Sequence, residues 1–151
     1  MELRAGGLGD PRVRALIAHH LAESRASTPA ANAHALGAGA LDRSDIDFWA
    51  MWDGEELLGI GALRMLDADH AEIKSMRTAP AHLRRGVARA ILAHLIAQAR
   101  TQGCARVSLE TGTMPMFDAA NRMYEAAGFV DCPAYGGYPA SPHNRFMTLM
   151  L

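Results

Sequence analysis

The chain has 151 residues, of which 50% are hydrophobic and 21% charged, and its formal net charge is −1. This length predicts one domain, residues 1–151, with a core of respectable size and no room for a second domain. The composition excludes a disordered chain, and the charge balance excludes attraction of the whole surface to nucleic acid.

The cysteines and the N-terminus indicate a cytoplasmic protein. Cys104 and Cys132 form neither a CxxC pair nor a disulfide framework, so we expect free thiols in a reducing compartment. Residues 1–7 contain no long apolar run, which predicts neither a secretion signal nor a membrane partner.

The first half of the chain predicts a strand, two helices and a three-stranded meander. Residues 2–5 are expected to form the first strand, and Asp10 and Pro11 provide an N-cap and a first-turn proline for a helix. Residues 24–45 are expected to hold a short second helix and a loop. The meander follows as strands 46–52, 56–65 and 71–78, the first two joined by the hairpin signal Asp53-Gly54.

The second half alternates helices and strands. The predicted elements are a helix over 86–102, a strand over 105–109 that continues to 112, a helix over 117–127, and closing strands 129–132 and 146–151. Gly103 and Gly128 end the two helices. The order β-α-α-β-β-β-α-β-α-β-β predicts an α/β (α+β) fold.

The most distinctive stretch is the turn at residues 79–86 and the amphipathic helix that follows it. Arg84, Arg85 and Arg89 surround Gly86, where free main-chain N–H groups and the positive helix end would face an anion. The spacing is neither Gly-x-x-x-x-Gly-Lys-Ser/Thr nor Gly-x-Gly-x-x-Gly. A basic helix end facing solvent would look the same, so a second signal is needed.

The turn resembles the Arg/Gln-x-x-Gly-x-Gly/Ala signature of the GCN5-related N-acetyltransferases (GNAT), with Gly86 and Ala88 in the last two positions. Leu83 departs from the motif, because the family usually has arginine or glutamine there. Downstream, residues 117–129 resemble the family's Ala-x-x-x-Tyr-x-x-x-Gly-Phe element, in which Tyr124 would lie beside the coenzyme A sulfur. A lone tyrosine on an apolar helix face is usually core, but two elements in the right order favour function.

The resemblance covers the whole chain and extends to a bacterial subgroup of small stand-alone acetyltransferases. It implies the GNAT fold: a mixed, mostly antiparallel sheet, splayed between strands four and five and flanked by about four helices. It also implies transfer of an acetyl group from acetyl-CoA, as cosubstrate, to an amine of a small molecule or peptide by direct attack in a ternary complex.

The resemblance further assigns roles to residues. The main chain at the end of the fourth strand would hydrogen-bond pantetheine, and the loop after it would hold the pyrophosphate. The implied cofactor-binding residues are Met76, Arg77, Thr78, Arg84, Arg85, Gly86, Val87, Ala88 and Arg89. Tyr124 would protonate the departing sulfur.

The base is assigned to Glu72, because family members often use a glutamate of strand four through a bridging water. By alternation Glu72 would share a face with Met76 and Thr78. A carboxylate paired with Lys74 or Arg64 fits the same pattern equally well. Glu110 is the second candidate, and could instead fix the turn that follows it.

The seven histidines show no ligand spacing with a carboxylate, so no metal is expected. For the acceptor, the segments able to reach the site are 32–41, the strand with Trp49 and Trp52, and 131–146. The sequence names no acceptor, predicts no nucleic-acid or membrane partner, and leaves a homodimer open.

Two other classes of protein share part of this sequence pattern. A nucleotide-binding oxidoreductase would need a third glycine after Gly59-Ile60-Gly61, where Arg64 stands instead, and these glycines lie within a strand. A non-catalytic acyl-CoA sensor would keep the phosphate site and need no proton donor, against which Tyr124 is a weak argument.

Overall fold

The computed structural model describes residues 1–29 and 34–151. These residues build a seven-stranded sheet of order β1-β2-β3-β4-β5-β7-β6. The strands are β1 (Glu2–Ala5), β2 (Ile46–Asp53), β3 (Glu56–Met65), β4 (His70–Thr78), β5 (Arg106–Gly112), β6 (Val130–Asp131) and β7 (Asn144–Met150). The helices are α1 (Pro11–Ser27), α2 (Ala38–Leu41), α3 (Val87–Thr101) and α4 (Asp118–Ala126), with 3-10 turns η2 (Pro80–His82) and η3 (Pro115–Phe117).

Neighbouring strands are antiparallel except β4 and β5, which run parallel. The predicted element order and fold class are confirmed. So are two local signals: Asp10 Oδ1 accepts a hydrogen bond from the Arg12 main-chain N–H at 2.8 Å, and Gly54 turns the β2–β3 hairpin with a φ of 61°. Among the described residues, none of the helices has the length and apolar character needed to cross a membrane.

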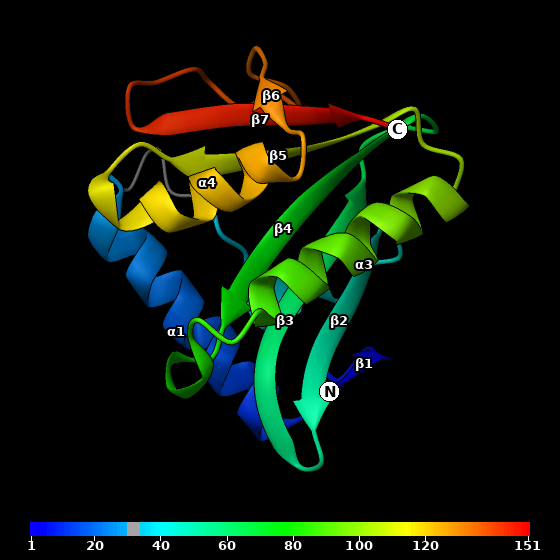
Figure 1. Cartoon of the computed structure of the whole chain (residues 1–151), viewed down its shortest axis with the longest axis vertical. Coiled ribbons are helices and arrows are strands. Elements are labelled where there is room, and N and C mark those ends of the chain that lie inside the picture. Colours follow the sequence, from blue (N-terminus) through cyan, green and yellow to red (C-terminus); the bar gives the residue numbers. More distant parts are fainter. Residues whose placement is uncertain (30–33) are drawn as a thin grey trace.

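The two faces of the sheet carry separate cores. On one face α3 packs through Val87, Ile91 and Leu95, and on the other α1 packs through Val13 and Ile17. Figure 1 shows α3 crossing in front of the sheet, with α1 towards the lower left. We call these faces the α3 side and the α1 side.

The glycines of Gly59-Ile60-Gly61 serve packing. A Cβ on Gly61 would lie 2.6 Å from Ile91 Cγ2, and one on Gly59 would lie 2.9 Å from Ile91 Cδ1. The absence of side chains therefore lets α3 approach β3 closely. This explains the pattern without a dinucleotide, whose binding loop would come between a strand and a helix.

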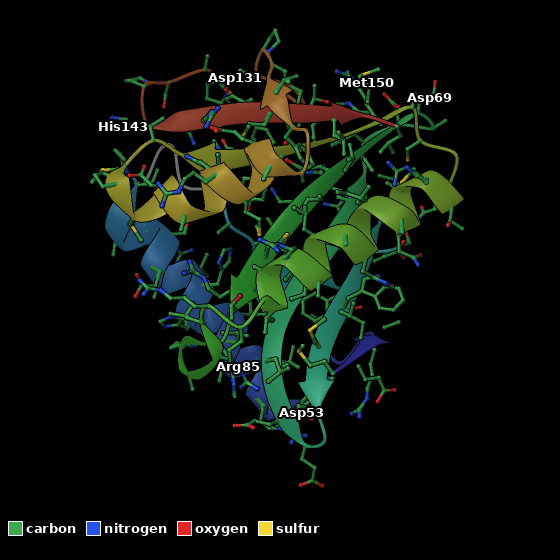
Figure 2. All side chains as sticks on the ribbon, viewed as in Figure 1. Asp53, Asp69, Arg85, Asp131, His143 and Met150 are labelled. Atoms are coloured by element: carbon green, nitrogen blue, oxygen red, sulfur yellow. The ribbon has the colours of Figure 1, made fainter. Side chains whose placement is uncertain are left out.

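Strands β4 and β5 separate along their length. Their pairing runs from His70 with Arg106 to Ile73 with Leu109, and the ladder ends there. Figure 1 shows β4 turning towards the lower left while β5 continues to the left. In Figure 2, Asp69 marks the paired end and Arg85, on the loop after β4, marks the open end. The predicted splay between the fourth and fifth strands is confirmed.

β4 also contains a bulge. Ala62 pairs with Lys74 and Ile60 with Arg77, so two residues of β4 lie opposite one residue of β3. The first of the two, Ser75, has a φ of 55°, in the left-handed region that non-glycine residues seldom adopt.

The bulge changes which residues share a face. Lys74 lies opposite Ala62 of the α1-side core, and Glu72 shares that side. Met76 packs into the α3-side core instead, and Thr78 lies opposite Gly59, which faces α3. The prediction that Glu72 shares a face with Met76 and Thr78 is therefore wrong, because the extra residue shifts the alternation by one.

Candidate active site

A cavity of about 840 Å³ opens where β4 and β5 separate. Its walls come from the ends of these two strands, the loop before α3 and its first turn, α4, and the second half of α1. It borders Met76 on the α3 side and Lys74 on the α1 side, so it connects the two faces of the sheet. Eight of the nine predicted cofactor-binding residues line it, as do Tyr124 and Glu72.

The α3 end of the cavity is a loop with two left-handed residues, Arg84 at φ 62° and Gly86 at φ 80°. Gly86 caps α3 without a side-chain hydrogen bond, and the Ala90 N–H bonds Gly86 O at 3.1 Å. The amides of residues 86–89 are therefore left at the positive helix end, which suits a phosphate. A Cβ on Gly86 would meet no atom within 4 Å, so conformation, and not crowding by the protein, favours glycine there.

Arg85 is the ninth predicted cofactor-binding residue, and it does not line the cavity. Its Nη1 donates to His82 Nδ1 at 2.6 Å, and His82 Nε2 lies 3.1 Å from Glu56 Oε1. This connection ties the loop to the start of β3, so the Arg85 side chain supports the loop. Leu83, the departure from the sequence motif, lines the cavity and is 60% exposed.

Tyr124 lies on the α4 wall of the cavity and packs against the α3-side core. Asn121 fixes α4 to the end of β5: its Nδ2 donates to Gly112 O at 3.1 Å and its Oδ1 accepts from Thr111 Oγ1 at 2.8 Å. The Tyr124 and Phe129 rings lie 6.0 Å apart. Burial raises the pKa of Tyr124 to about 12, so the phenol keeps its proton at neutral pH and is available as a donor.

The main chain of β4 borders the cavity beyond Ile73, where β5 no longer pairs with it. The bulge adds irregular main chain at the same place. The Ser75 Oγ is buried there without a hydrogen-bond partner among the described residues. Polar groups of this kind can bind an extended ligand that carries its own amides.

Glu72 is fully buried on the α1 side. Its Oε2 accepts from the Tyr135 hydroxyl at 2.8 Å and its Oε1 from the Tyr138 hydroxyl at 3.2 Å. Lys74 Nζ lies 3.6 Å and Arg64 Nη1 4.0 Å from Oε1. Glu72 is thus ion-paired as the alternative interpretation held, and both of its oxygens already accept hydrogen bonds.

Glu110 belongs to a second cluster of polar side chains on the α1 side. His34 Nδ1 lies 2.6 Å from Glu110 Oε2, which also accepts from Asn144 Nδ2 at 2.9 Å. The His34 ring stacks on Tyr138, with centroids 4.7 Å apart. Burial raises the pKa of Glu110, and the hydrogen bond with His34 opposes this. Both Glu110 and His34 line the cavity.

Arg77 enters the cavity wall together with His20. The Arg77 Nε donates to His20 Nδ1 at 3.0 Å. Burial, with a smaller contribution from the charge of Arg77, lowers the pKa of His20 to about 4. His20 is therefore neutral at pH 7 and serves as the acceptor that orients the guanidinium.

The expected acceptor segments are only partly at the cavity. Residues 32 and 33 lie outside the described residues. His34 and Asn144 line the cavity, whereas Trp49 and Trp52 pack in the cores. The contact of His34 with Glu110 joins residues 76 positions apart, so no local spacing in the sequence indicates it.

Within residues 1–29 and 34–151, no group of three or more His, Cys, Asp or Glu side chains could hold a metal ion. Both cysteines are free, Cys104 buried and Cys132 partly so.

The splayed parallel pair, the seven-stranded sheet and the helices that flank it form an acetyltransferase fold. The chain belongs to the Acetyltransferase (GNAT) family, whose family model matches residues 14–129. The resemblance found in the phosphate loop and the Tyr124 element is confirmed. The family uses acetyl-CoA as cosubstrate.

Two relatives have similar length. YedL of Escherichia coli strain K12, an uncharacterized N-acetyltransferase, is 44% identical over 99% of this chain and 94% of its own. YsnE of Bacillus subtilis strain 168, also an uncharacterized N-acetyltransferase, is 42% identical over 100% of both chains.

Solved structures show the same fold. A proposed acyl-CoA N-acyltransferase from Klebsiella pneumoniae superposes with a TM-score of 0.81 at 24% identity, covering 99% of this chain and 97% of that one. A GNAT family acetyltransferase from Elizabethkingia anophelis, with acetyl-CoA bound, has a TM-score of 0.67 at 15% identity over 99% and 97% of the two chains.

Proposed function

We propose that this protein transfers the acetyl group of acetyl-CoA to the amine of a small molecule or peptide, by direct attack within a ternary complex. The observation that carries the proposal is the cavity of about 840 Å³. It extends from the amides at the start of α3, past Tyr124, to the polar side chains of the α1 side. We expect the protein to act in the cytoplasm as a single domain, without a metal, nucleic-acid or membrane partner.

The cavity has groups suited to the pyrophosphate and to the pantetheine arm of acetyl-CoA. The amides at residues 86–89 suit the pyrophosphate, and the guanidinium groups of Arg84 and Arg89, which line the cavity, add charge. The main chain of residues 74–78, on the side of β4 that β5 no longer pairs with, suits the amides of the pantetheine arm. The bound acetyl-CoA of the Elizabethkingia protein supports this use of the fold.

The protein's own residues then supply the chemistry. A main-chain amide at the β4 bulge would polarise the thioester carbonyl, because a fixed N–H stabilises the developing oxyanion. Tyr124 would protonate the leaving sulfur. The role of Glu72 as base stays a prediction, and Glu110 also borders the cavity.

The test is release of free thiol from acetyl-CoA in the presence of a panel of alkyl, aromatic and peptide amines, with mass spectrometry of the products. Acetyl transfer to an amine supports the proposal. Tight binding of acetyl-CoA by calorimetry, with no thiol release on any amine or water, would instead indicate the acyl-CoA sensor.

A further inference from the structure

We propose that His34 is the proton acceptor for the attacking amine and that Glu110 orients its imidazole. The assignment rests on the proposed acetyl transfer and adds the group that makes the acceptor nucleophilic. An alkyl amine has a pKa near that of lysine, about 10.4, so at neutral pH nearly all of it is protonated and a base is needed.

The side chains of His34 and Glu110 are in direct contact. The 2.6 Å distance between His34 Nδ1 and Glu110 Oε2 is short for a hydrogen bond between nitrogen and oxygen. Their side chains are 17% and 12% exposed. With Glu110 accepting at Nδ1–H, the other ring nitrogen, Nε2, carries the lone pair. Asn144 holds the same carboxylate oxygen at 2.9 Å, which fixes Glu110 from β7.

His34 and Tyr124 lie on opposite sides of the same cavity. His34 and Glu110 line the cavity on the α1 side, and Tyr124 lines it from α4 on the α3 side. Acyl transfer needs a proton removed from the attacking nitrogen and a proton supplied to the leaving sulfur. Since these atoms lie on opposite sides of the acyl carbon, a base and an acid on opposite walls of one cavity suit the reaction.

Glu72 differs from His34 in its burial and in its hydrogen bonds. Its two oxygens accept hydrogen bonds from Tyr135 and Tyr138, and its side chain is 1% exposed. A proton on Glu72 would disrupt a buried network that includes Lys74. Among the described residues, His34 contacts Glu110 through Nδ1, and accepting a proton at Nε2 requires no such rearrangement.

Charged and titratable groups face the pair from each neighbouring element. Glu72 and Lys74 act on Glu110 from β4, and Tyr138 stacks on His34 from the segment before β7. The opposite charges of Glu72 and Lys74 are paired with each other. The negative charge of Glu110 is then the one that faces the His34 ring directly.

The ammonium loses one proton to His34 Nε2, and the freed nitrogen forms the N–C bond with the thioester carbon. As the C–S bond breaks, the sulfur leaves with the electron pair and takes the proton of Tyr124. The second proton lost by the nitrogen restores Tyr124, and His34 releases its proton to solvent.

The experiment compares wild type with His34→Gln in thiol release from acetyl-CoA, with an alkyl amine, with an aromatic amine of low pKa, and with water alone. His19→Gln, on α1 and away from this cavity, is the matched control. We expect His34→Gln to lower alkyl-amine turnover by about 10²–10⁴-fold and to remove the ionisation of the wild-type pH profile. The aromatic amine should lose much less, and affinity for acetyl-CoA by calorimetry should stay unchanged.

Glu110→Gln tests the positioning role. The amide still contacts the ring but carries no charge to hold it, so kcat with the alkyl amine should fall, though less than in His34→Gln, while KM for acetyl-CoA stays unchanged. A merely structural Glu110 would lower the stability of the protein and leave kcat of the folded enzyme unchanged.

Wild-type turnover and pH profile in His34→Gln would overturn the assignment, as would equal losses on both amines. Loss of the ionisation in Glu72→Gln, with His34→Gln unaffected, would return the role to Glu72. If no amine of the panel is used, the same comparison is made on hydrolysis by water. A wild type that releases no thiol under any of these conditions contradicts the acetyl-transfer proposal itself.

Discussion

On the α3 side of the sheet, the cavity is walled by main-chain amides, by small or apolar residues such as Gly86 and Val87, and by the basic side chains of Arg84 and Arg89. On the α1 side, the same cavity is walled by ionisable side chains such as Lys74, Glu110 and His34. Main-chain donors remain when side chains change, whereas a network of side chains is lost with any of its members. We therefore expect the α3 side to bind a ligand common to many proteins, and the α1 side to determine what is particular to this one.

The difference between the two sides is tested most directly at Tyr124, the α3-side residue for which we propose a role in the chemistry. Tyr124→Phe should lower kcat by about 10²–10⁴-fold with little change in KM for acetyl-CoA, because the hydroxyl acts on the leaving sulfur and not on the bound ground state. Steady-state kinetics with a rapid-quench check on the chemical step measure this.

Tyr135→Phe is the matched control on the α1 side. It removes the hydroxyl that donates to buried Glu72 at 2.8 Å, so its main effect should be on stability, about 1–3 kcal/mol. If Tyr124→Phe kept full turnover with chemistry rate-limiting, Tyr124 would be a packing residue.

The close approach of α3 to the sheet gives the next effect. In Gly61→Ala the new Cβ would lie 2.6 Å from Ile91 Cγ2 and 3.1 Å from Leu95 Cδ1. We expect the free energy of unfolding to fall by about 1–3 kcal/mol through overpacking, measured by urea denaturation. Gly39→Ala, whose Cβ would meet nothing within 4 Å, is the control, and equal effects of both would argue against the packing explanation.

Gly86→Val should weaken acetyl-CoA binding. The protein leaves room for the Cβ, but a φ of 80° costs a non-glycine residue about 1–2 kcal/mol. This corresponds to a loss of roughly 5- to 30-fold in affinity if the loop shifts to relieve the strain. Calorimetric titration measures it, and unchanged affinity would refute the placement of the phosphate site.

The smallest effect concerns pH and the α1 side. The pKa of His20 is lowered to about 4 in the folded protein, against about 6.5 in an unfolded chain. The unfolded state therefore binds more protons between pH 6.5 and 4, so stability is full above pH 6.5 and is lost as pH falls through 4.

His20→Gln keeps an acceptor for Arg77 and removes this ionisation. Between pH 7 and 4 it should lose less stability than wild type, by on the order of 1 kcal/mol after allowance for partial exposure. Thermal unfolding across this range tests the expectation, and parallel curves for the two proteins would contradict it.

Most of the fold follows from local signals in the sequence. The hydrophobic spacing, the cap at Asp10 and the hairpin at Gly54 each act over a few residues, so they could be recognised without the structure. The same holds for the loop at Gly86 and for the helix that ends at Gly128. Most of the α3 side of the cavity could therefore be predicted from these elements.

The α1 side depends on contacts between distant residues, which spacing does not encode. Glu110 meets His34 across 76 positions and Glu72 meets Tyr135 across 63. The bulge at Ser75 has no signal of its own either, because a serine at φ 55° looks like any other strand serine in the sequence. That one residue led the alternation argument to the wrong face for Glu72.

Deleting Ser75 would remove the extra residue of the bulge and leave the faces of β4 as they are. Met76 would then follow Lys74 in regular alternation and take the place opposite Gly61, so it would still face α3, and Arg77 would still lie opposite Ile60. Keeping Ser75 in a regular strand would instead turn Met76 away from the α3-side core and Arg77 away from the face that it shares with Lys74. The deletion therefore separates two properties of this segment: it should abolish the irregular main chain at the cavity while each remaining side chain of the strand keeps its face.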